Sequence, residues 1–435
     1  MQRVLLRCGT LRFGALELLG VKHPFVNYYS SLIMQVDPMI HAHHSINNRK
    51  KLFVIGTTLL IVWIIMTIIP LFFEGKTGRL IADVIDRSIY FERGRWFTDG
   101  TLPISEYPQV PTLLFGVNNL TSMWADSNIR IKVYSAFFSL EMLLVLFLIT
   151  KVLLELLPPS LSNSVLLVFL PPTLYFTYNR FDILPAYFCL LAYSSATKKQ
   201  WTMTSVLLAI ATFTKWYPVL LFPGFFIYAT TLEKKFQWRM LVGFTVTSIG
   251  IVLASYLSGG AKTVLVPYTF HMTRGMEDLA FPVLLDNLTR GLLGTQVSSP
   301  YFSLLFFVAQ IAAPLLIFFV KFDSIDVLVD YCIIVIGVFV LFSKIWSPQW
   351  FLWLLPFLII SAKNTKKTEL IILYNFVTYL SFPLIFDYYG DSSYQLQIAG
   401  SLVYFILLII IFQSVNSLKK HLTTDGFRRL TASDG

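Results

Sequence analysis

Residues 52–73 read LFVIGTTLLIVWIIMTIIPLFF, a run of 22 residues without a charged side chain. A helix needs about 20 apolar residues to cross the hydrocarbon core of a bilayer. Lys51 precedes the run and Glu74 follows it, so charged residues mark both of its ends. Because the backbone polar groups of a spanning segment must pair within that segment, the run predicts a membrane-spanning helix and an all-α integral membrane protein.

The composition of the whole chain agrees with this prediction. Of its 435 residues, 56% are hydrophobic and only 13% are charged, whereas about 25% of the residues of an ordinary soluble domain are charged. The hydrophobic share corresponds to about 244 residues, enough for at most roughly twelve helices of ~20 residues. A soluble protein is excluded, and too few residues remain for a large extramembrane catalytic domain with its own core.

Charges, prolines and polar loops divide the chain into about twelve apolar segments. They fall at about 52–73, 133–157, 162–178, 181–196, 201–216, 217–232, 240–257, 301–320, 327–343, 347–362, 369–386 and 396–415. Several prolines between 162 and 232 predict kinked or partial spans in that region. The predicted organisation is an N-terminal segment at 1–51, a transmembrane domain at 52–415 with long loops at 74–132 and 258–300, and a tail at 416–435.

Lysine and arginine cluster in alternate connections between these segments. The six sites are Arg49 to Lys51, Lys198-Lys199, Lys234-Lys235 with Arg239, Lys321, Lys363 with Lys366-Lys367, and Lys419-Lys420. The positive-inside rule places these connections, and both termini, in the cytoplasm. The net charge of +10 is therefore explained by membrane topology and anionic lipids, and nucleic acid is not expected as a partner. Both long loops then face the extracytoplasmic side.

The first long loop carries candidate catalytic acids. If its beginning is helical, Asp83, Asp86 and Tyr90 lie on one helix face. A carboxylate just outside the first span, partly desolvated at the lip of a membrane cavity, is suited to act as a general base. Glu106 is a third acid, near the end of the loop. The alternative is an interfacial helix whose acids pair with arginines of the same loop, namely Arg79, Arg87 or Arg93.

Four separate basic residues lie on the same predicted extracytoplasmic side. They are Arg180, Lys215, Arg274 and Lys344, each beside an aromatic residue or a proline. A lipid phosphate at a membrane interface needs cations of this kind, together with aromatic walls for an isoprenoid and a sugar. The alternative for each one is a snorkelling interface anchor.

Other features carry less weight. His271 stands alone in the second long loop, where a lone histidine is more often a hydrogen-bonded loop residue than an acid or a ligand. No extracytoplasmic Asp-x-Asp occurs, so no metal and no cofactor is predicted. Asn119-Leu-Thr and Asn287-Leu-Thr fit the N-glycosylation pattern.

Six short motifs occur in order between about residues 50 and 360. They are Asp86-Arg-Ser-Ile-Tyr90, Glu106-Tyr-Pro-Gln109, Asn179-Arg-Phe-Asp182-Ile-Leu-Pro185, Thr214-Lys-Trp-Tyr-Pro218, His271-Met-Thr-Arg-Gly275 and Ser343-Lys-Ile-Trp-Ser-Pro-Gln-Trp350. Together they resemble the polyprenol-phosphate-mannose-dependent mannosyltransferases of glycosyltransferase family 87, within the multispanning GT-C superfamily. Three positions depart from the family pattern. Gln109 replaces a proline, Trp350 replaces a tyrosine, and Leu279-Ala280 stand where a Glu-Ser pair is usual, with Glu277-Asp278 slightly earlier.

The resemblance implies a GT-C-like bundle with helices in its extracytoplasmic loops. It also implies inverting transfer of mannose from a polyprenyl- or dolichyl-phosphate donor to a glycan or glycolipid acceptor, with Asp86 as base and Asp83 as runner-up. Donor binding would then fall to a set of residues in the matched motifs: Tyr90, Arg180, Lys215, Tyr217, His271, Arg274, Lys344 and Gln349. The family is mainly prokaryotic, which favours the plasma membrane over the endoplasmic reticulum.

Two other functions stay open on the sequence. A twelve-span transporter or lipid-linked sugar flippase would need ionisable residues near the middle of several helices. Glu141, Lys151 and Glu155 are the main candidates within an apolar run, and they are few and confined to one segment. A ligase or polymerase of the O-antigen type would instead use a lipid-pyrophosphate donor.

Overall fold

A computed structural model describes residues 48–72, 76–293, 299–390 and 393–421. The chain forms two compact units, Met1–Thr57 and Thr58–Gly435. The predicted N-terminal segment, 1–51, lies outside the described residues except for its last four positions, and the tail at 416–435 is described only to His421. All the residues of the candidate site discussed below belong to the second unit.

Helices make up the regular structure of the described residues, and no β-strand occurs among them. Five are long and apolar enough to cross a membrane: Asn48–Ile68, Ile129–Leu156, Trp238–Gly259, Thr365–Tyr389 and Tyr394–Leu418. Five shorter apolar helices lie at Pro159–Phe169, Ile183–Thr197, Trp201–Thr212, Phe307–Phe318 and Pro348–Ser361. The prediction of an all-helical membrane protein is confirmed at this level, whereas a total of twelve crossings stays a prediction.

Proline divides several of the predicted segments. The segment at 162–178 is two helices, η2 (Pro159–Phe169) and α8 (Pro171–Asn179), because Pro171 lacks the amide hydrogen that would continue the first helix. The segment at 217–232 likewise consists of η3 (Tyr217–Leu220) and α11 (Phe222–Glu233). The kinks expected between 162 and 232 are therefore present.

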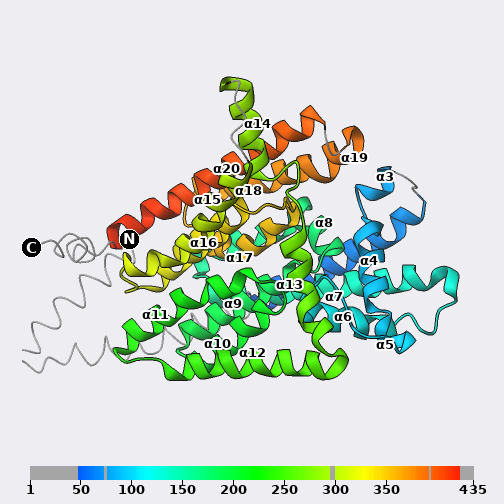
Figure 1. Ribbon diagram of the computed structural model, residues 1–435, viewed down its shortest axis with the longest axis horizontal. Helices are drawn as coiled ribbons and strands as arrows, with labels where there is room; N and C mark the ends of the chain where they lie inside the picture. Colours follow the sequence, from blue (N-terminus) through cyan, green and yellow to red (C-terminus); the bar gives the residue numbers. More distant parts are fainter. Residues whose placement is uncertain (1–47, 73–75, 294–298, 391–392, 422–435) are drawn as a thin grey trace, which may run out of the picture. The chain divides into compact units, whose positions relative to one another are not determined.

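The centre of the bundle is formed by α9 (Ile183–Thr197), α16 (Ile325–Leu341) and α17 (Phe351–Ser361) (Figure 1). Every residue of α17 is buried. A helix that is apolar on all sides belongs inside a bundle, whereas a lipid-facing helix leaves its apolar side chains exposed. The long helix α12 (Trp238–Gly259) is of the second kind, because Met240 and Gly243 are its only buried residues. Helix α10 (Trp201–Thr212) packs against both α9 and α12.

The first long loop is folded into short helices. They are α3 (Lys76–Arg79), α4 (Val84–Gly94), α5 (Trp96–Asp99) and α6 (Gln109–Leu120), and α7 (Ser127–Leu156) follows them. Helices α4 and α6 approach each other closely at Gly94, where a Cβ atom would lie 2.2 Å from the carbonyl oxygen of Phe115. The ring of Tyr90 on α4 stacks on Phe115 with a centroid distance of 4.7 Å. These contacts hold α4, and with it Asp86, against the bundle.

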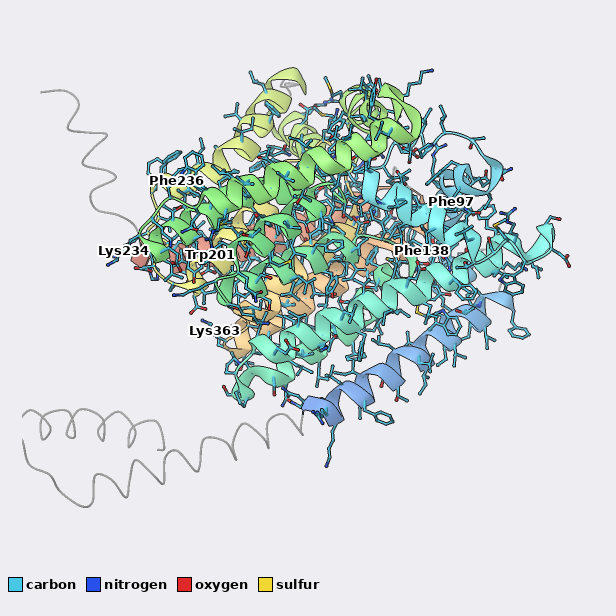
Figure 2. All side chains as sticks on the ribbon, turned by 90° about the horizontal axis from the view of Figure 1, so that it is seen from below. Phe97, Phe138, Trp201, Lys234, Phe236 and Lys363 are labelled. Carbon is cyan, nitrogen blue, oxygen red and sulfur yellow. The ribbon has the colours of Figure 1, made fainter. Side chains whose placement is uncertain are left out.

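The second long loop contains α13 (Ala261–Thr273) and α14 (Phe281–Leu293). It is followed by α15 (Ser299–Ala312), and the chain ends its described part with α18 (Thr365–Tyr379) and α20 (Tyr394–Leu418). Lys234 and Lys363, from two predicted cytoplasmic clusters, lie toward one end of the bundle, and Phe97 of the first long loop lies toward the other (Figure 2). Loop helices were predicted for both long loops, and both loops contain them.

Candidate active site

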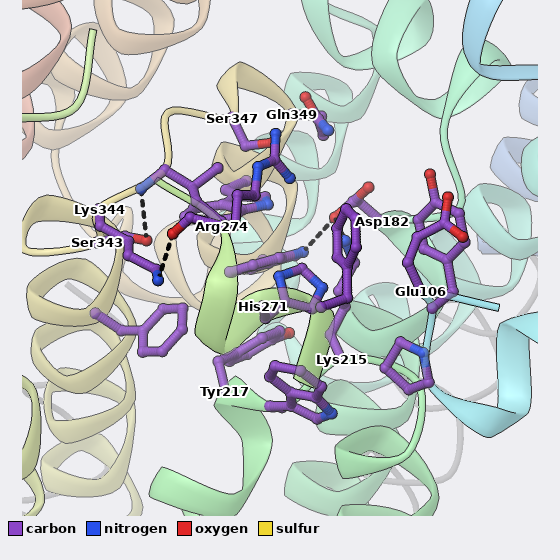
Figure 3. A pocket seen from close by; sticks show the side chains of 18 of the residues that line it. Glu106, Asp182, Lys215, Tyr217, His271, Arg274, Ser343, Lys344, Ser347 and Gln349 are labelled. Atoms are coloured by element: carbon purple, nitrogen blue, oxygen red, sulfur yellow. Dashed lines mark hydrogen bonds and ion pairs between the residues drawn. The ribbon is translucent and has the colours of Figure 1, made fainter. Parts of the chain in front are cut away.

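A cavity of about 870 Å³ lies where the two long loops meet the short connections of the bundle. Its lining comes from α4, the 106–108 turn, the residues just before α9, the turn into η3, helices α13 to α15, and the connection from α16 to α17 with the adjoining ends of these two helices. Nine of the eleven side chains predicted from the sequence line it: Asp86, Tyr90, Glu106, Lys215, Tyr217, His271, Arg274, Lys344 and Gln349. Figure 3 shows Glu106 and Asp182 at one side of the cavity and Ser343 and Lys344 at the other.

Asp83 does not line the cavity. It is the N-cap of α4, where its Oδ1 accepts a hydrogen bond from the amide of Ile85 at 3.0 Å. Its Oδ2 lies 2.6 Å from Nη2 of Arg180, and only 6% of the residue is exposed. An aspartate just before a helix usually satisfies the free amides of the first turn. The runner-up assignment of Asp83 as general base stays a prediction that this placement does not favour, because its carboxylate is engaged by the cap and by Arg180.

Arg180 also lies outside the cavity lining. Its two terminal nitrogens join Asp83 and Asp86, each at 2.6 Å, and its side chain is 5% exposed. Its predicted contact with a donor phosphate is not supported by this placement. Instead, Arg180 compensates two carboxylates that would otherwise lie close together in a poorly solvated region.

Of the three arginines named in the alternative, Arg93 is the one that pairs with an acid of its own loop in the described residues: its Nε lies 2.6 Å from Oε2 of Glu106. Arg79 pairs instead with Asp387 at 3.7 Å. Arg87 donates to the backbone oxygen of Asp83 and to Ser139, not to a carboxylate. Asp86 thus has no ion pair with Arg79, Arg87 or Arg93 in the described structure, and its partner is Arg180.

Asp86 presents its carboxylate to the cavity, with 27% of its side chain exposed. Tyr90, one turn further along α4, places its hydroxyl 3.5 Å from Asp86 Oδ2. Burial raises the pKa of Asp86 above its usual value, and the charges of Asp83 and Asp182 add to this effect, while Arg180 and Lys215 oppose it. A carboxylate of raised pKa is a stronger base when it is ionised.

Lys215 reaches the cavity from the turn before η3. Its ammonium lies 3.3 Å from Oδ1 of Asp182 and over the ring of Phe181, 4.7 Å from the ring centroid. Asp182 was quoted in a sequence motif but was not predicted as a site residue. The signal that could have found it is its position directly after Arg180 and Phe181 in a connection that brings charges to the predicted face.

Arg274 and Lys344 are joined through the loop that follows α13. Lys344 donates hydrogen bonds to the backbone oxygens of Arg274 at 2.7 Å and Met272 at 3.3 Å. Glu277 pairs with the guanidinium of Arg274, and its other oxygen accepts from the amide of Trp346 at 2.8 Å. Glu277, which stands before the family's usual acid position, therefore connects the two cation-bearing segments.

His271 lies between the carboxylates and the cations. Its ring meets Trp216 edge to face at 4.8 Å. Burial lowers the pKa of His271 to about 4, and the charges of Lys215 and Arg274 act in the same direction, against a hydrogen bond to the backbone of Glu106. His271 is therefore neutral near pH 7 and offers a ligand a hydrogen bond, not a positive charge.

Aromatic rings form much of the remaining wall. Tyr217 stacks on Trp353 at 4.3 Å, and Trp350 stacks on Trp353 at 4.7 Å. Trp216 and Tyr268 form a second stack at 5.1 Å. Flat apolar surfaces beside charged groups suit a ligand with a hydrophobic chain or a sugar ring joined to an anion.

The charged groups define what the cavity can do chemically. Within the described ranges, no group of three or more His, Cys, Asp or Glu side chains is placed to hold a metal ion. The lining does offer one carboxylate of raised basicity and three cations. Such a set can remove a proton from one group and stabilise negative charge on another. No known family model matches the chain, and no curated protein matches it.

Proposed function

We propose that the protein is a membrane glycosyltransferase that transfers a hexose, mannose by the family resemblance, from a polyprenyl- or dolichyl-phosphate donor. The acceptor is a glycan or glycolipid on the extracytoplasmic face. The observation that carries the proposal is the single cavity that gathers Asp86, Lys215, Arg274 and Lys344 from four separate parts of the chain. The plasma membrane is the favoured location, with the endoplasmic reticulum as the alternative.

In this proposal Asp86 removes the proton of an acceptor hydroxyl. The hydroxyl oxygen forms a bond to the anomeric carbon while the bond from that carbon to the phosphate oxygen breaks. The displacement inverts the anomeric centre, and the leaving group is the polyprenyl phosphate. The pairing of Asp86 with Arg180 supports this role, because the arginine keeps part of the carboxylate population ionised despite burial.

The cations act on the leaving group. As the glycosidic bond breaks, negative charge grows on the phosphate, and positive groups already in place stabilise that charge more than they stabilise the ground state. All three cations line the cavity and each is held by another group: Lys215 by Asp182, Arg274 by Glu277 and Lys344 by backbone oxygens. The aromatic stacks around Trp353 and Trp216 would contact the isoprenoid chain and the sugar.

The test supplies radiolabelled polyprenyl-phosphate-mannose and lipid or glycan acceptors to the purified protein. We expect transfer by the unaltered protein and a loss of about 100-fold or more in Asp86→Asn, as for removal of a general base. Asp126→Asn is the matched control, because Asp126 is an exposed carboxylate of the same loop whose side chain makes no cap hydrogen bond. Full activity of Asp86→Asn would contradict the role of Asp86, and movement of the lipid-linked sugar without transfer would favour the transporter.

A second test asks whether the first long loop lies on the extracytoplasmic side of the membrane. A tag inserted at Gly100, an exposed turn residue with φ of 65° in the first long loop, reports on which side of the membrane that loop lies. We expect the tag to be accessible from the extracytoplasmic side. A cytoplasmic tag would contradict donor use on the extracytoplasmic face.

A further inference from the structure

Asp182 is a buried carboxylate in the cavity wall for which the proposed chemistry has assigned no step. It directly precedes α9, yet its side chain does not cap that helix. Its Oδ1 instead accepts a hydrogen bond from Nε1 of Trp353 at 3.1 Å and lies 3.3 Å from Nζ of Lys215. With only 1% of its side chain exposed, the charge of Asp182 needs both partners to remain in this position.

Lys215 is held from several directions. Besides Asp182, its ammonium faces the rings of Phe181, at 4.7 Å, and Trp353, at 5.8 Å from the ring centroids. Its side chain is 20% exposed, and it lines the cavity. An ammonium has three N–H groups, and one carboxylate oxygen cannot accept all of them. Lys215 therefore keeps donor capacity toward the cavity while its position is set from behind.

We infer that Asp182 is a positioning residue: anchored by Trp353, it holds the Lys215 ammonium where the ammonium meets an anionic group bound in the cavity. That this anion is the phosphate of the lipid donor rests on the proposed function. The positioning of Lys215 by Asp182 does not rest on it. Asp182 thus acts through Lys215 and makes no contact of its own with the reacting atoms.

The variant Asp182→Asn separates the effects of the two contacts that the carboxylate makes, with Trp353 and with Lys215. An amide oxygen can still accept the hydrogen bond from Trp353, so the aromatic stack keeps its anchor, whereas the negative charge opposite Lys215 is lost. Trp353→Phe does the reverse, because it removes the donor and keeps a ring. Asp182→Glu keeps the charge on a longer side chain and serves as the conservative variant.

The first experiment follows the reactivity of Lys215 without reference to any enzymatic activity. An amine-reactive acylating reagent is applied to the full-length protein in detergent at mildly alkaline pH, and modified peptides are quantified by mass spectrometry. We expect Lys215 to be acylated severalfold faster in Asp182→Asn, because the carboxylate oxygen that holds its Nζ at 3.3 Å is replaced by a neutral amide and the amine is freer to reach the reagent. Lys132, exposed on α7, serves as the internal reference.

The second experiment is a double-mutant cycle on transfer. We expect Asp182→Asn to lower kcat/KM for the donor by about tenfold or more, and Asp182→Glu to restore part of it. In a Lys215→Met background, we expect Asp182→Asn to cost little more, since residues acting through one another are not additive. A residue that merely supported the fold would show its full cost in both backgrounds.

The pH profile gives a third measure of the same arrangement. The charged and titratable groups that interact with Asp86 are Arg180, Asp83, Asp182, Lys215, Tyr90 and Tyr107. The negative charge of Asp182 raises the pKa of Asp86, so Asp182→Asn moves the acidic limb of kcat/KM to lower pH. An unmoved limb would contradict the placement of Asp182 beside Asp86.

The outcomes distinguish this inference from the proposed function. If the unaltered protein transfers no sugar but Lys215 becomes more reactive in Asp182→Asn, the function fails and the positioning stands. If Lys215 is acylated equally in both proteins, or if the cycle is additive, the positioning role is overturned even where transfer is observed.

Discussion

Arg180 Nη1 lies 2.6 Å from Asp86 Oδ2. The acid predicted as a base and a cation predicted to bind phosphate are thus partners of one another. Arg180 also holds Asp83, and both of these residues are buried. These ion pairs join the start of α4 to the end of α8 and set the charge environment of the candidate base.

Arg180→Met tests how much the ion pairs of Arg180 with Asp83 and Asp86 contribute to the free energy of unfolding. The variant leaves the buried carboxylate of Asp83 without its cation, and breaking a buried ion pair from one side costs about 3–5 kcal/mol of unfolding free energy. Arg95→Met is the control, because Arg95 pairs with Glu92 and Asp99 on the exposed surface of the loop. Denaturant unfolding in detergent measures both variants, and equal losses would contradict the role given to Arg180.

The raised pKa of Asp86 predicts the pH dependence of transfer. A general base works when deprotonated, so kcat/KM falls as the pH decreases through the pKa of Asp86, which lies above the usual value for aspartate. Lys215 lowers this pKa, so the residual activity of Lys215→Met should have its acidic limb at higher pH than the unaltered protein. A limb that moves to lower pH in Lys215→Met would contradict this electrostatic arrangement.

His271 should stay neutral well below its ordinary titration range. Its pKa of about 4 in the folded protein lies below that of an unfolded histidine, about 6.5. The folded state therefore binds its proton less readily, and this contribution to stability, complete above about pH 6.5, is lost as the pH falls toward 4. NMR of histidine-labelled protein, with His271→Gln to assign the signal, measures the ionisation directly. A midpoint near 6.5 would overturn the neutral assignment.

The two glycosylation motifs should behave differently. Asn119 is fully buried, and its Nδ2 donates a hydrogen bond to the backbone oxygen of Phe91 at 2.9 Å, whereas Asn287 is exposed. We expect folded protein from a glycosylating host to carry no glycan on Asn119. Glycosidase treatment of Asn119→Gln and Asn287→Gln variants tests this, and a glycan lost only with Asn119 would contradict the packing of α6.

Gly94 permits the close approach of α4 and α6. A methyl group there would meet the Phe115 carbonyl at 2.2 Å, so Gly94→Ala must push α4 away and should lower both stability and any activity that depends on Asp86. Gly250→Ala on α12 is the matched control, since no heavy atom lies within 4 Å of its Cβ position. Thermal unfolding should show a loss for Gly94→Ala and no loss for Gly250→Ala, where alanine is the better helix former.

The helical class and the position of most candidate residues could be predicted from the sequence. Apolar runs such as 52–73 form helices because the bilayer demands that backbone polar groups pair locally, and Pro171 shows from its chemistry alone where a helix must break. Short motifs likewise placed Asp86, Lys215, Arg274 and Lys344 in connections of one predicted face. Each of these is a local property of the sequence and can therefore be predicted from the sequence alone.

Only the tertiary structure decided which charge meets which. Arg180 and Asp83 lie far apart in sequence, yet they pair, and Asp83 caps α4 and does not line the cavity as Asp86 does. Asp182 gains its importance from Lys215, in the turn before η3, and from Trp353, in helix α17. Charge pairing depends on distance and burial in three dimensions, and neither follows from local hydrophobicity or motif spacing. The sequence by itself determined a helical membrane protein with its acids and cations in the loops, and the packing of those loops determined which of them face a common cavity.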